Sequence, residues 1–348
     1  MTPEPNSLRT PPRPSPPTQA RPVMSDVPDM TGRPRRLRLM AGLRQVAGAR
    51  QLAERARAAE AAGYDVLAIT DHLGADQLAP VPALAVVAAA TDRLRIATLV
   101  LNNDLRHPAV LAHELATLDV LSGGRLEIGL GAGWNRSEYA AAGIPFEAGA
   151  VRVERLAETV RILKGLAAGG PFTMRGRHYA IDGLDGLPKP VQRPHPPLLI
   201  GGGSRRLLEL AAREADVVGL LPRADTLERR DFSDWLPEAT DRKVAWVRQA
   251  AGDRFARLEL NTCNPLWPVQ VTDRALAVAT EMAGQIEARM GMRATARDLL
   301  DSPYVFIGSV DRLADKLREL RDRFGVGSVM LGELDDRVTP VVERVAAG

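Results

Sequence analysis

The chain has 348 residues and carries 46 Lys and Arg against 43 Asp and Glu, a formal net charge of +3 that is too small for the electrostatic footprint of a nucleic-acid-binding protein. Cys263 is its only cysteine, so no disulfide framework can form within one chain. Because it has neither an apolar run of about 18 residues nor a signal-peptide core, we expect a cytoplasmic protein with no membrane partner.

The first 34 residues are rich in proline and poor in large apolar side chains. Such a composition cannot bury enough surface to offset the entropy lost on ordering, so it predicts a disordered tail over residues 1–34. We expect residues 35–348 to form a single domain.

From Leu37 onward, short apolar runs alternate with helical patterns. The runs predicted as strands are LRLMA, YDVLAIT, RLRIATLVL, RLEIGLG, PLLIGGG, ADVVGLLP, RLELNTC and VGSVMLGEL. Alternation of strands and helices is typical of a parallel sheet covered by helices on both sides. Eight such units in a little over 300 residues predict an α/β fold, a (β/α)8 TIM barrel with insertions. A doubly wound open sheet is the alternative.

The helical patterns differ in clarity along the chain. Helical spacing is clear over residues 151–166, where four apolar residues form one stripe: Val153, Leu156, Val160 and Leu163. Gly63 stands where a glycine commonly ends a helix. Three longer segments interrupt the alternation, and we expect insertions at about 170–197, 223–257 and 264–305. The first has no regular pattern, and the other two contain helical stretches.

The stretch GLGAGWNRSEY, residues 129–139, follows the fourth expected strand. A Rossmann fingerprint needs G-x-G-x-x-G in the first βαβ unit, whereas the sixth position here is Trp134 and the stretch comes later in the chain. In a barrel, small residues at this end of a strand let a flat ring or its side chain lie against the backbone. Trp134, Asn135 and Glu138 would then rise from the catalytic face. A tight turn without a ligand is the alternative.

Two other strand ends carry polar groups at the same face. ITDHLG places Asp71 and His72 after the second strand, and imidazole exchanges protons near neutrality. A structural His72 and an Asp71 that caps the next turn are the alternatives. After the third strand, Asn102, Asn103 and Asp104 add polar groups to this rim or satisfy the loop backbone.

The stretch LIGGGSRR places three glycines between an expected strand and a helix. Free N–H groups at a helix start, together with the helix dipole, form a phosphate site, and a plain turn is the alternative. With Arg205 and Arg206 adjacent, we favour anion binding. These strand ends together predict a phosphorylated cofactor with a large flat ring.

Several phrases, in this order, resemble the bacterial luciferase-like superfamily, and within it the branch of oxidoreductases that use the deazaflavin coenzyme F420. The resemblance covers roughly residues 36–335. The phrases are GYDVLAITDHLG, RLRIATLVLNNDLRHPAVLAHELATLDVLSGGRLEIGLGAGWNRSEYAAAGIPF, GRHYAIDG, PKPVQRPHPPLLIGGGSRRLLELAAREADVVGL and FIGSVDRLADKLREL.

The resemblance implies a luciferase-like barrel, often dimeric, that binds a flavin or deazaflavin at the carboxyl ends of its strands. It implies a cis peptide between Leu99 and Val100 that supports the ring. His72, with Asp71 before it, matches a family histidine that lies near the reactive carbon and serves in proton transfer. Trp134 stands where sugar-phosphate dehydrogenases of this branch often have Glu, which argues against the same substrate.

The prediction is therefore an F420-dependent oxidoreductase that transfers a hydride between the reduced cofactor and a small or medium organic substrate, in a homodimer. We expect no metal site. The expected catalytic residues are His72, Asp71 and Trp134, and the expected cofactor contacts are Leu99, Val100, Asn102, Gly133, Asn135, Gly201, Gly202, Gly203 and Ser204. One alternative is an FMN-dependent two-component monooxygenase supplied by a separate reductase. The other is a non-catalytic cofactor-binding barrel.

Overall fold

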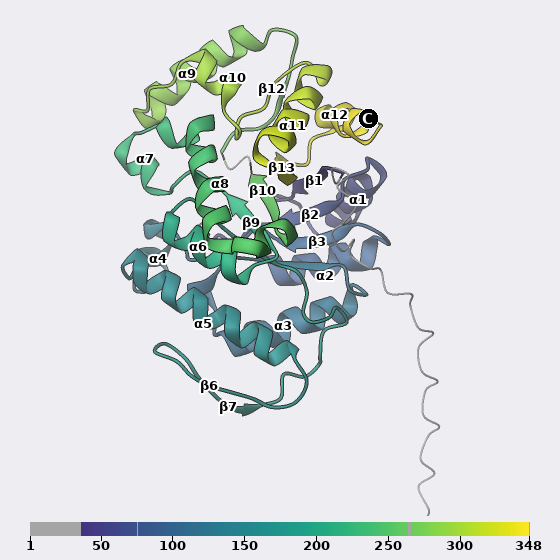
Figure 1. The fold of residues 1–348 in the computed structure, drawn as a ribbon. Helices are drawn as coiled ribbons and strands as arrows, with labels where there is room; N and C mark the ends of the chain where they lie inside the picture. Colours follow the sequence, from purple (N-terminus) through teal and green to yellow (C-terminus); the bar gives the residue numbers. More distant parts are fainter. Residues whose placement is uncertain (1–35, 75, 264–265, 348) are drawn as a thin grey trace, which may run out of the picture. The chain divides into compact units, whose positions relative to one another are not determined.

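The structure, a computed structural model, describes residues 36–74, 76–263 and 266–347. The tail predicted over residues 1–34 lies outside them. In the described ranges, eight parallel strands form a barrel (Figure 1). In chain order they are β1 (Arg38–Gly42), β2 (Val66–Ile69), β3 (Arg95–Thr98), β5 (Leu126–Gly131), β8 (Leu198–Gly202), β9 (Val217–Leu220), β10 (Glu259–Cys263) and β13 (Val326–Glu333).

The strands close into a ring. Their order around it is β3-β2-β1-β13-β10-β9-β8-β5, and β3 pairs with β5 to complete the circle. All of these pairings are parallel. A short strand, β4 (Leu101–Asn102), follows β3 and also pairs with β5. The closed ring confirms the predicted (β/α)8 TIM barrel and excludes the doubly wound open sheet.

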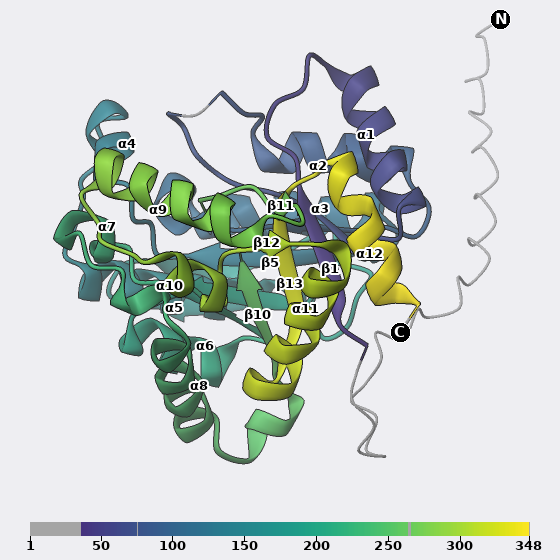
Figure 2. The ribbon, with the colours of Figure 1, turned by 90° about the horizontal axis from the view of Figure 1, so that it is seen from above.

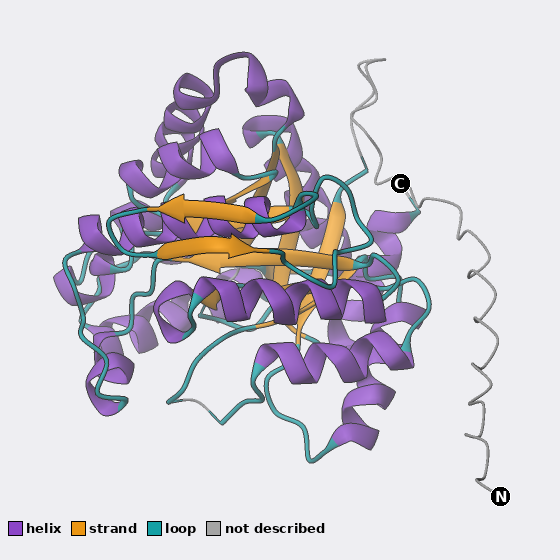
Figure 3. Cartoon of the chain, turned by 90° about the horizontal axis from the view of Figure 1, so that it is seen from below, coloured by secondary structure: helices purple, strands orange, loops and turns teal. Residues whose placement is uncertain are grey.

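Helices surround the strands, as the views from above and below show (Figures 2 and 3). None of the helices in the described part of the chain is both long and apolar enough to cross a membrane. The helices that follow successive barrel strands are α1 (Ala49–Ala61), α2 (Pro80–Ala90), α3 (Pro108–Leu121), α5 (Gly149–Ala167), α6 (Arg205–Glu214), α8 (Pro237–Ala251), α11 (Val310–Phe324) and α12 (Thr339–Ala346).

The predicted details of two helices are present in the structure. The predicted stripe of α5 is buried, because its four apolar residues face the barrel at a helical period: Val153, Leu156, Val160 and Leu163. Gly63 follows α1 with φ of +86°, a left-handed conformation that favours glycine at a helix end.

The three segments expected as insertions contain regular structure. Segment 170–197 holds an antiparallel pair, β6 (Phe172–Arg175) and β7 (Ala180–Leu184), where we expected irregular backbone. The apolar alternation of β6 spans only four residues, and β7 is mostly exposed, so the local signal is short. In segment 223–257, α8 follows α7 (Asp225–Arg229) and packs against α6 as the helix between β9 and β10. Segment 264–305 holds β11 (Gln270–Val271), α9 (Ala275–Met290) and α10 (Ala296–Asp301), and β11 pairs with β12 (Ile307–Gly308).

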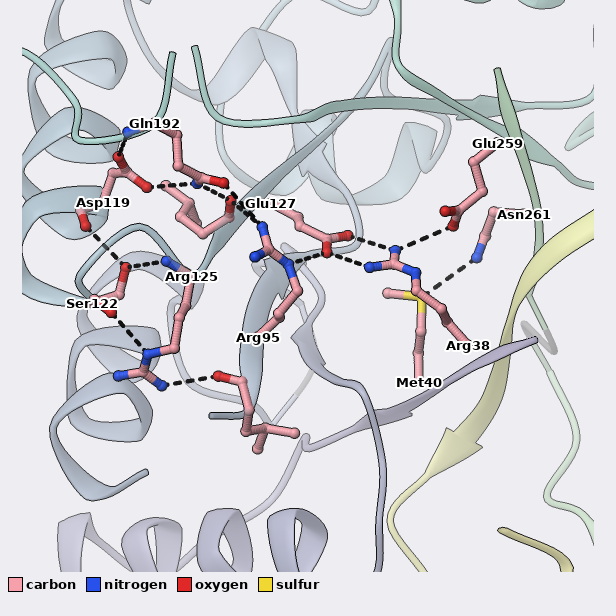
Figure 4. A network of polar contacts seen from close by, with 12 residues as sticks. Arg38, Met40, Arg95, Asp119, Ser122, Arg125, Glu127, Gln192, Glu259 and Asn261 are labelled. Atoms are coloured by element: carbon pink, nitrogen blue, oxygen red, sulfur yellow. Dashed lines mark hydrogen bonds and ion pairs between the residues drawn. The ribbon is translucent and has the colours of Figure 1, made fainter. Parts of the chain in front are cut away.

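Charged side chains fill the amino-terminal end of the barrel interior (Figure 4). Arg38 contacts Glu127 at 2.7 Å and Glu259 at 3.1 Å, and Arg95 contacts Glu127 at 2.5 Å. Burial alone would raise the pKa of Glu127, but the two arginines outweigh burial and lower that pKa to about 2. This ion-pair network closes the base of the barrel, so the opposite end is the one open to a ligand.

Candidate active site

The carboxyl ends of the parallel strands lie together at one end of the barrel, which we call the mouth. Asp71 and His72 follow β2, and Trp134 follows β5. The rings of His72 and Trp134 lie 5.8 Å apart in an edge-to-face arrangement, and Asp71 accepts a hydrogen bond from the backbone N–H of Asn102 at 3.0 Å. The structure therefore brings together residues that the sequence analysis selected from three separate strand ends.

His72 is held by a carboxylate that the list of expected site residues omitted. Its Nδ1 lies 2.8 Å from Oε1 of Glu138, on α4 (Arg136–Ala141). A carboxylate only accepts hydrogen bonds, so Nδ1 carries the proton and Nε2 is the second proton-exchanging atom. The His72 side chain is 28% exposed and that of Glu138 is 9% exposed, so the pair is partly shielded yet reachable from solvent. Glu138 was predicted at the catalytic face, in the phrase GLGAGWNRSEY that ends in EY, but was given no role.

The position of Glu138 depends on a helix cap. Asn135 precedes α4, and its side-chain oxygen accepts hydrogen bonds from Ser137 N at 3.2 Å and Ser137 Oγ at 2.6 Å. This cap starts the helix directly after Trp134, which is 49% exposed. Asn135, an expected cofactor contact, thus uses its side-chain oxygen to orient the helix that carries Glu138.

Asp71 is buried in an ion pair. Its carboxylate lies 2.6 Å and 3.1 Å from the two terminal nitrogens of Arg106, and it also accepts the Asn102 N–H. The residue is 5% exposed. With both oxygens bonded to protein groups, Asp71 ties the loop of His72 to the end of β4. This geometry fits a positioning role better than the catalytic role expected from sequence.

The glycines of β5 make room for the neighbouring strand segment. The peptide bond between Leu99 and Val100 is cis, as the resemblance implies. A Cβ on Gly129 would overlap the carbonyl oxygen of Thr98, and a Cβ on Gly131 would lie 2.7 Å from Val100 Cγ2. The space that we expected a flat ring to use is therefore taken by Val100 and the backbone beside it.

Gly133 is required by a buried tyrosine. Its φ of +76° favours glycine, and a Cβ there would overlap the hydroxyl of Tyr139 and lie 2.8 Å from Asn102 Oδ1. The Tyr139 hydroxyl lies 2.9 Å from Asn102 Oδ1 and 3.0 Å from Asp104 Oδ2. Burial and the charge of Asp104 raise the pKa of Tyr139. Sequence reasoning missed Tyr139, although it too belongs to the EY phrase.

The expected phosphate site lies at the start of α6. Ser204 caps this helix, accepting a hydrogen bond from Leu207 N at 3.4 Å. A Cβ on Gly203 would lie 2.6 Å from backbone atoms of Leu221 and Arg223, so this glycine allows a close backbone approach. The first N–H groups of a helix have no backbone partner within it, so those that Ser204 does not cap can bind an anion.

The two arginines after Ser204 have other partners. Arg205 pairs with Glu209 at 2.8 Å, and Arg206 pairs with Glu154 at 2.8 Å. Anion binding at this helix would therefore rely on backbone N–H groups and Ser204. Gly201, within β8, lies beside Val100, since a Cβ there would be 3.6 Å from Val100 Cγ1. Val100 thus lies between the β5 and β8 glycines.

Two curated proteins resemble parts of this chain. An FMNH(2)-dependent dimethylsulfone monooxygenase from Pseudomonas putida is 36% identical over 128 residues, which is 37% of this chain and 35% of that protein. An F420-dependent glucose-6-phosphate dehydrogenase from Beutenbergia cavernae is 37% identical over 128 residues, which is 35% of this chain and 38% of that protein. The chain thus spans little more than a third of the length of these relatives, whose names give different cofactors.

Solved structures share the fold, and a family model matches most of the sequence. The coenzyme F420-dependent tetrahydromethanopterin reductase from Methanopyrus kandleri superposes with a TM-score of 0.69 at 20% identity, over 88% of this chain and 96% of that one. At this identity the likeness shows the fold alone. The model for luciferase-like monooxygenases matches residues 33–326. The chain therefore belongs to the luciferase-like monooxygenase family of oxidoreductases.

Proposed function

We propose that this protein is an F420-dependent oxidoreductase that transfers a hydride between the reduced deazaflavin and a small or medium organic substrate. The observation that carries the proposal is the His72–Glu138 pair at the mouth, 2.8 Å apart. Hydride addition to a carbonyl or activated alkene leaves a negative charge that needs a proton, and imidazole supplies one near neutral pH. The mouth offers this group beside an exposed aromatic ring, that of Trp134.

The residues at the mouth fit a planar, phosphorylated cofactor. Val100, between Gly131 and Gly201, presents an apolar surface on which a flat ring can lie. The capped start of α6 presents backbone N–H groups and Ser204 toward an anion. We therefore propose that Leu99, Val100 and the Gly201–Ser204 segment hold the cofactor, which supplies the hydride chemistry when bound.

His72 would move the balancing proton at Nε2. Glu138 accepts a hydrogen bond from the Nδ1–H group, which orients the ring and stabilises the imidazolium form. Asp71 positions the same loop through Arg106 and the Asn102 backbone. General acid–base catalysis of this kind typically contributes about 10²- to 10⁴-fold in rate.

Cofactor titration tests the proposal most directly. The apo-protein is titrated with F420 and with FMN while its tryptophan fluorescence is followed. We expect saturable quenching by F420, whereas tight FMN binding with no response to F420 would contradict the proposal. Light scattering of the same samples tests the homodimer that we also propose.

Variants then test the role assigned to the pair. Glu138→Gln keeps the size of the side chain and removes its charge. We expect turnover of a panel of carbonyl and enone acceptors with reduced F420 to fall by at least tenfold, while cofactor affinity stays unchanged. The matched control is Glu54→Gln, at an exposed position on α1. Equal turnover in both variants would exclude a role for Glu138 in proton transfer.

A second candidate is an FMN-dependent two-component monooxygenase, which the Pseudomonas putida relative favours. It predicts FMN binding and consumption of O₂ only when a separate reductase is added. A non-catalytic barrel predicts cofactor binding but no acceptor turnover, with no further loss in His72→Ala.

A further inference from the structure

The segment after β1 places an arginine beside the loop that carries His72. Leu43 N donates to the carbonyl oxygen of Ala68 at the end of β2, at 3.2 Å. Gln45 Nε2 donates to Asp76 Oδ2 at 3.3 Å, and Asp76 belongs to the loop after β2. Arg44 lies between these two anchors and is exposed. Its backbone is therefore held at the mouth next to the β2 loop.

Most arginines described at this end of the barrel already have a partner, and two of them, Arg136 and Arg152, lie over the ring of Phe146. Those that form ion pairs are Arg106 with Asp71, Arg155 with Asp104, Arg205 with Glu209, Arg206 with Glu154 and Arg223 with Asp225. Among the described residues, Arg44 forms no ion pair and donates no hydrogen bond; neither Asp76 nor Glu333, which pairs in register with Gly42, forms an ion pair with it. Its positive charge is thus available to a ligand.

The charge of Arg44 acts on the inside of the mouth. Cys263 ends β10 and, like Val100, packs against the apolar cluster that fills the barrel interior. Burial raises the pKa of Cys263 to about 12, and Arg44 is the charged group that opposes this rise. The guanidinium therefore favours negative charge at Cys263, at the carboxyl end of β10.

The strand order separates Arg44 from the proposed phosphate site. In the closed ring, β1 and β8 are four strands apart in either direction, so they lie on opposite sides of the barrel. A cofactor whose phosphate is held at Ser204, after β8, would have that phosphate on the side of the barrel away from Arg44. An anion bound by Arg44 would then be a different group, on the β1 and β2 side of the mouth.

We propose that Arg44 binds a carboxylate of the organic substrate and so selects organic acids over neutral analogues. The proposal rests on the function proposed above, because it takes the mouth as the substrate site. His72 and the exposed ring of Trp134 lie beside each other at this end, so the acid would place an apolar body against Trp134 and its charged end at Arg44. The substrate class is thus an aliphatic or aromatic carboxylic acid.

Matched probes test this directly. Benzoate and benzamide have the same ring and nearly the same size but differ in charge, and their binding to the cofactor-loaded protein is measured by calorimetry. We expect benzoate to bind more tightly than benzamide. In Arg44→Gln the Kd for benzoate should rise about five- to tenfold, which corresponds to about 1–1.4 kcal/mol, while that for benzamide stays constant. Arg44→Lys should retain most of the preference.

The control variant removes the same charge away from the mouth. Arg57 is exposed on α1, about two helical turns after the start of that helix, and forms no ion pair among the described residues. We expect Arg57→Gln to bind both probes as the unmodified protein does. The proposal is overturned if benzoate has no advantage over benzamide, or if Arg57→Gln weakens benzoate as much as Arg44→Gln.

The same samples separate this proposal from the proposed function. If neither F420 nor FMN binds, the proposed function fails, and the two probes are then titrated into the chain without cofactor. An Arg44-dependent preference for benzoate in that experiment would still support the carboxylate site. Tight cofactor binding without such a preference would overturn the Arg44 proposal alone.

Discussion

Replacing Glu127 by Gln tests the ion-pair network at the base of the barrel. The variant keeps the shape of the side chain but removes the negative charge between Arg38 and Arg95. The folded-state pKa of Glu127 is lowered from 4.5 to about 2. Each pKa unit corresponds to about 1.4 kcal/mol, so the charge contributes about 3 kcal/mol to the free energy of unfolding at pH 7.

The stabilising effect of the Glu127 charge should depend on pH. A carboxylate with a lowered folded-state pKa stabilises the protein fully above pH 4.5, and this contribution is lost as the pH falls toward 2. Protonated Glu127 resembles Gln, so the stability difference between the two proteins should shrink over the same range. Denaturant unfolding at pH 7, 4 and 3 measures it.

A second variant of the same network serves as the control. Within the described ranges Glu259 forms an ion pair with Arg38 alone, at 3.1 Å, and its side chain is 16% exposed. Glu259→Gln should therefore cost less than Glu127→Gln, about 1 kcal/mol. The reasoning would be refuted if Glu127→Gln lowered the free energy of unfolding at pH 7 by less than about 1 kcal/mol. It would also be refuted if the stability difference between the variant and the unmodified protein stayed constant from pH 7 to 3.

Two further substitutions probe local strain and a buried charge. Gly133→Ala should lower the free energy of unfolding by about 2–4 kcal/mol, against about 1 kcal/mol for Gly143→Ala. Both glycines have positive φ, but a Cβ meets the Tyr139 hydroxyl at Gly133 and nothing within 4 Å at Gly143, so equal losses in chemical denaturation would contradict the clash. Burial lowers the pKa of Lys316, which donates to the carbonyls of Leu300 and Val305, to about 7. Because the unfolded chain binds more protons above that pH, stability should rise by about 2 kcal/mol from pH 7 to 9, and Lys316→Met should lack this rise. Parallel pH profiles for the two proteins would argue against it.

The alternation of strands and helices was enough to predict the barrel. Buried parallel strands such as β2 and β9 are short apolar runs, and amphipathic helices such as α5 show a helical period, so both are visible locally. Strand ends that carry His72 and Trp134 could be placed at one mouth because the carboxyl ends of parallel strands lie together. The short strands β6 and β7 were not predicted, because the alternation of β6 spans only four residues and β7 is mostly exposed.

The pairings that shape the site were decided only by the tertiary structure. His72 meets Glu138 across 66 residues, and Asp71 meets Arg106 across 35, so no local pattern reveals either bond. Likewise, the β5 glycines could be read as room for a ligand, whereas the structure fills much of that room with Val100. A sequence shows which side chains stand at a strand end. The closed ring brings distant segments together and so decides which of these side chains pair. This pairing depends on tertiary packing and not on the conformational preference of any short stretch of sequence.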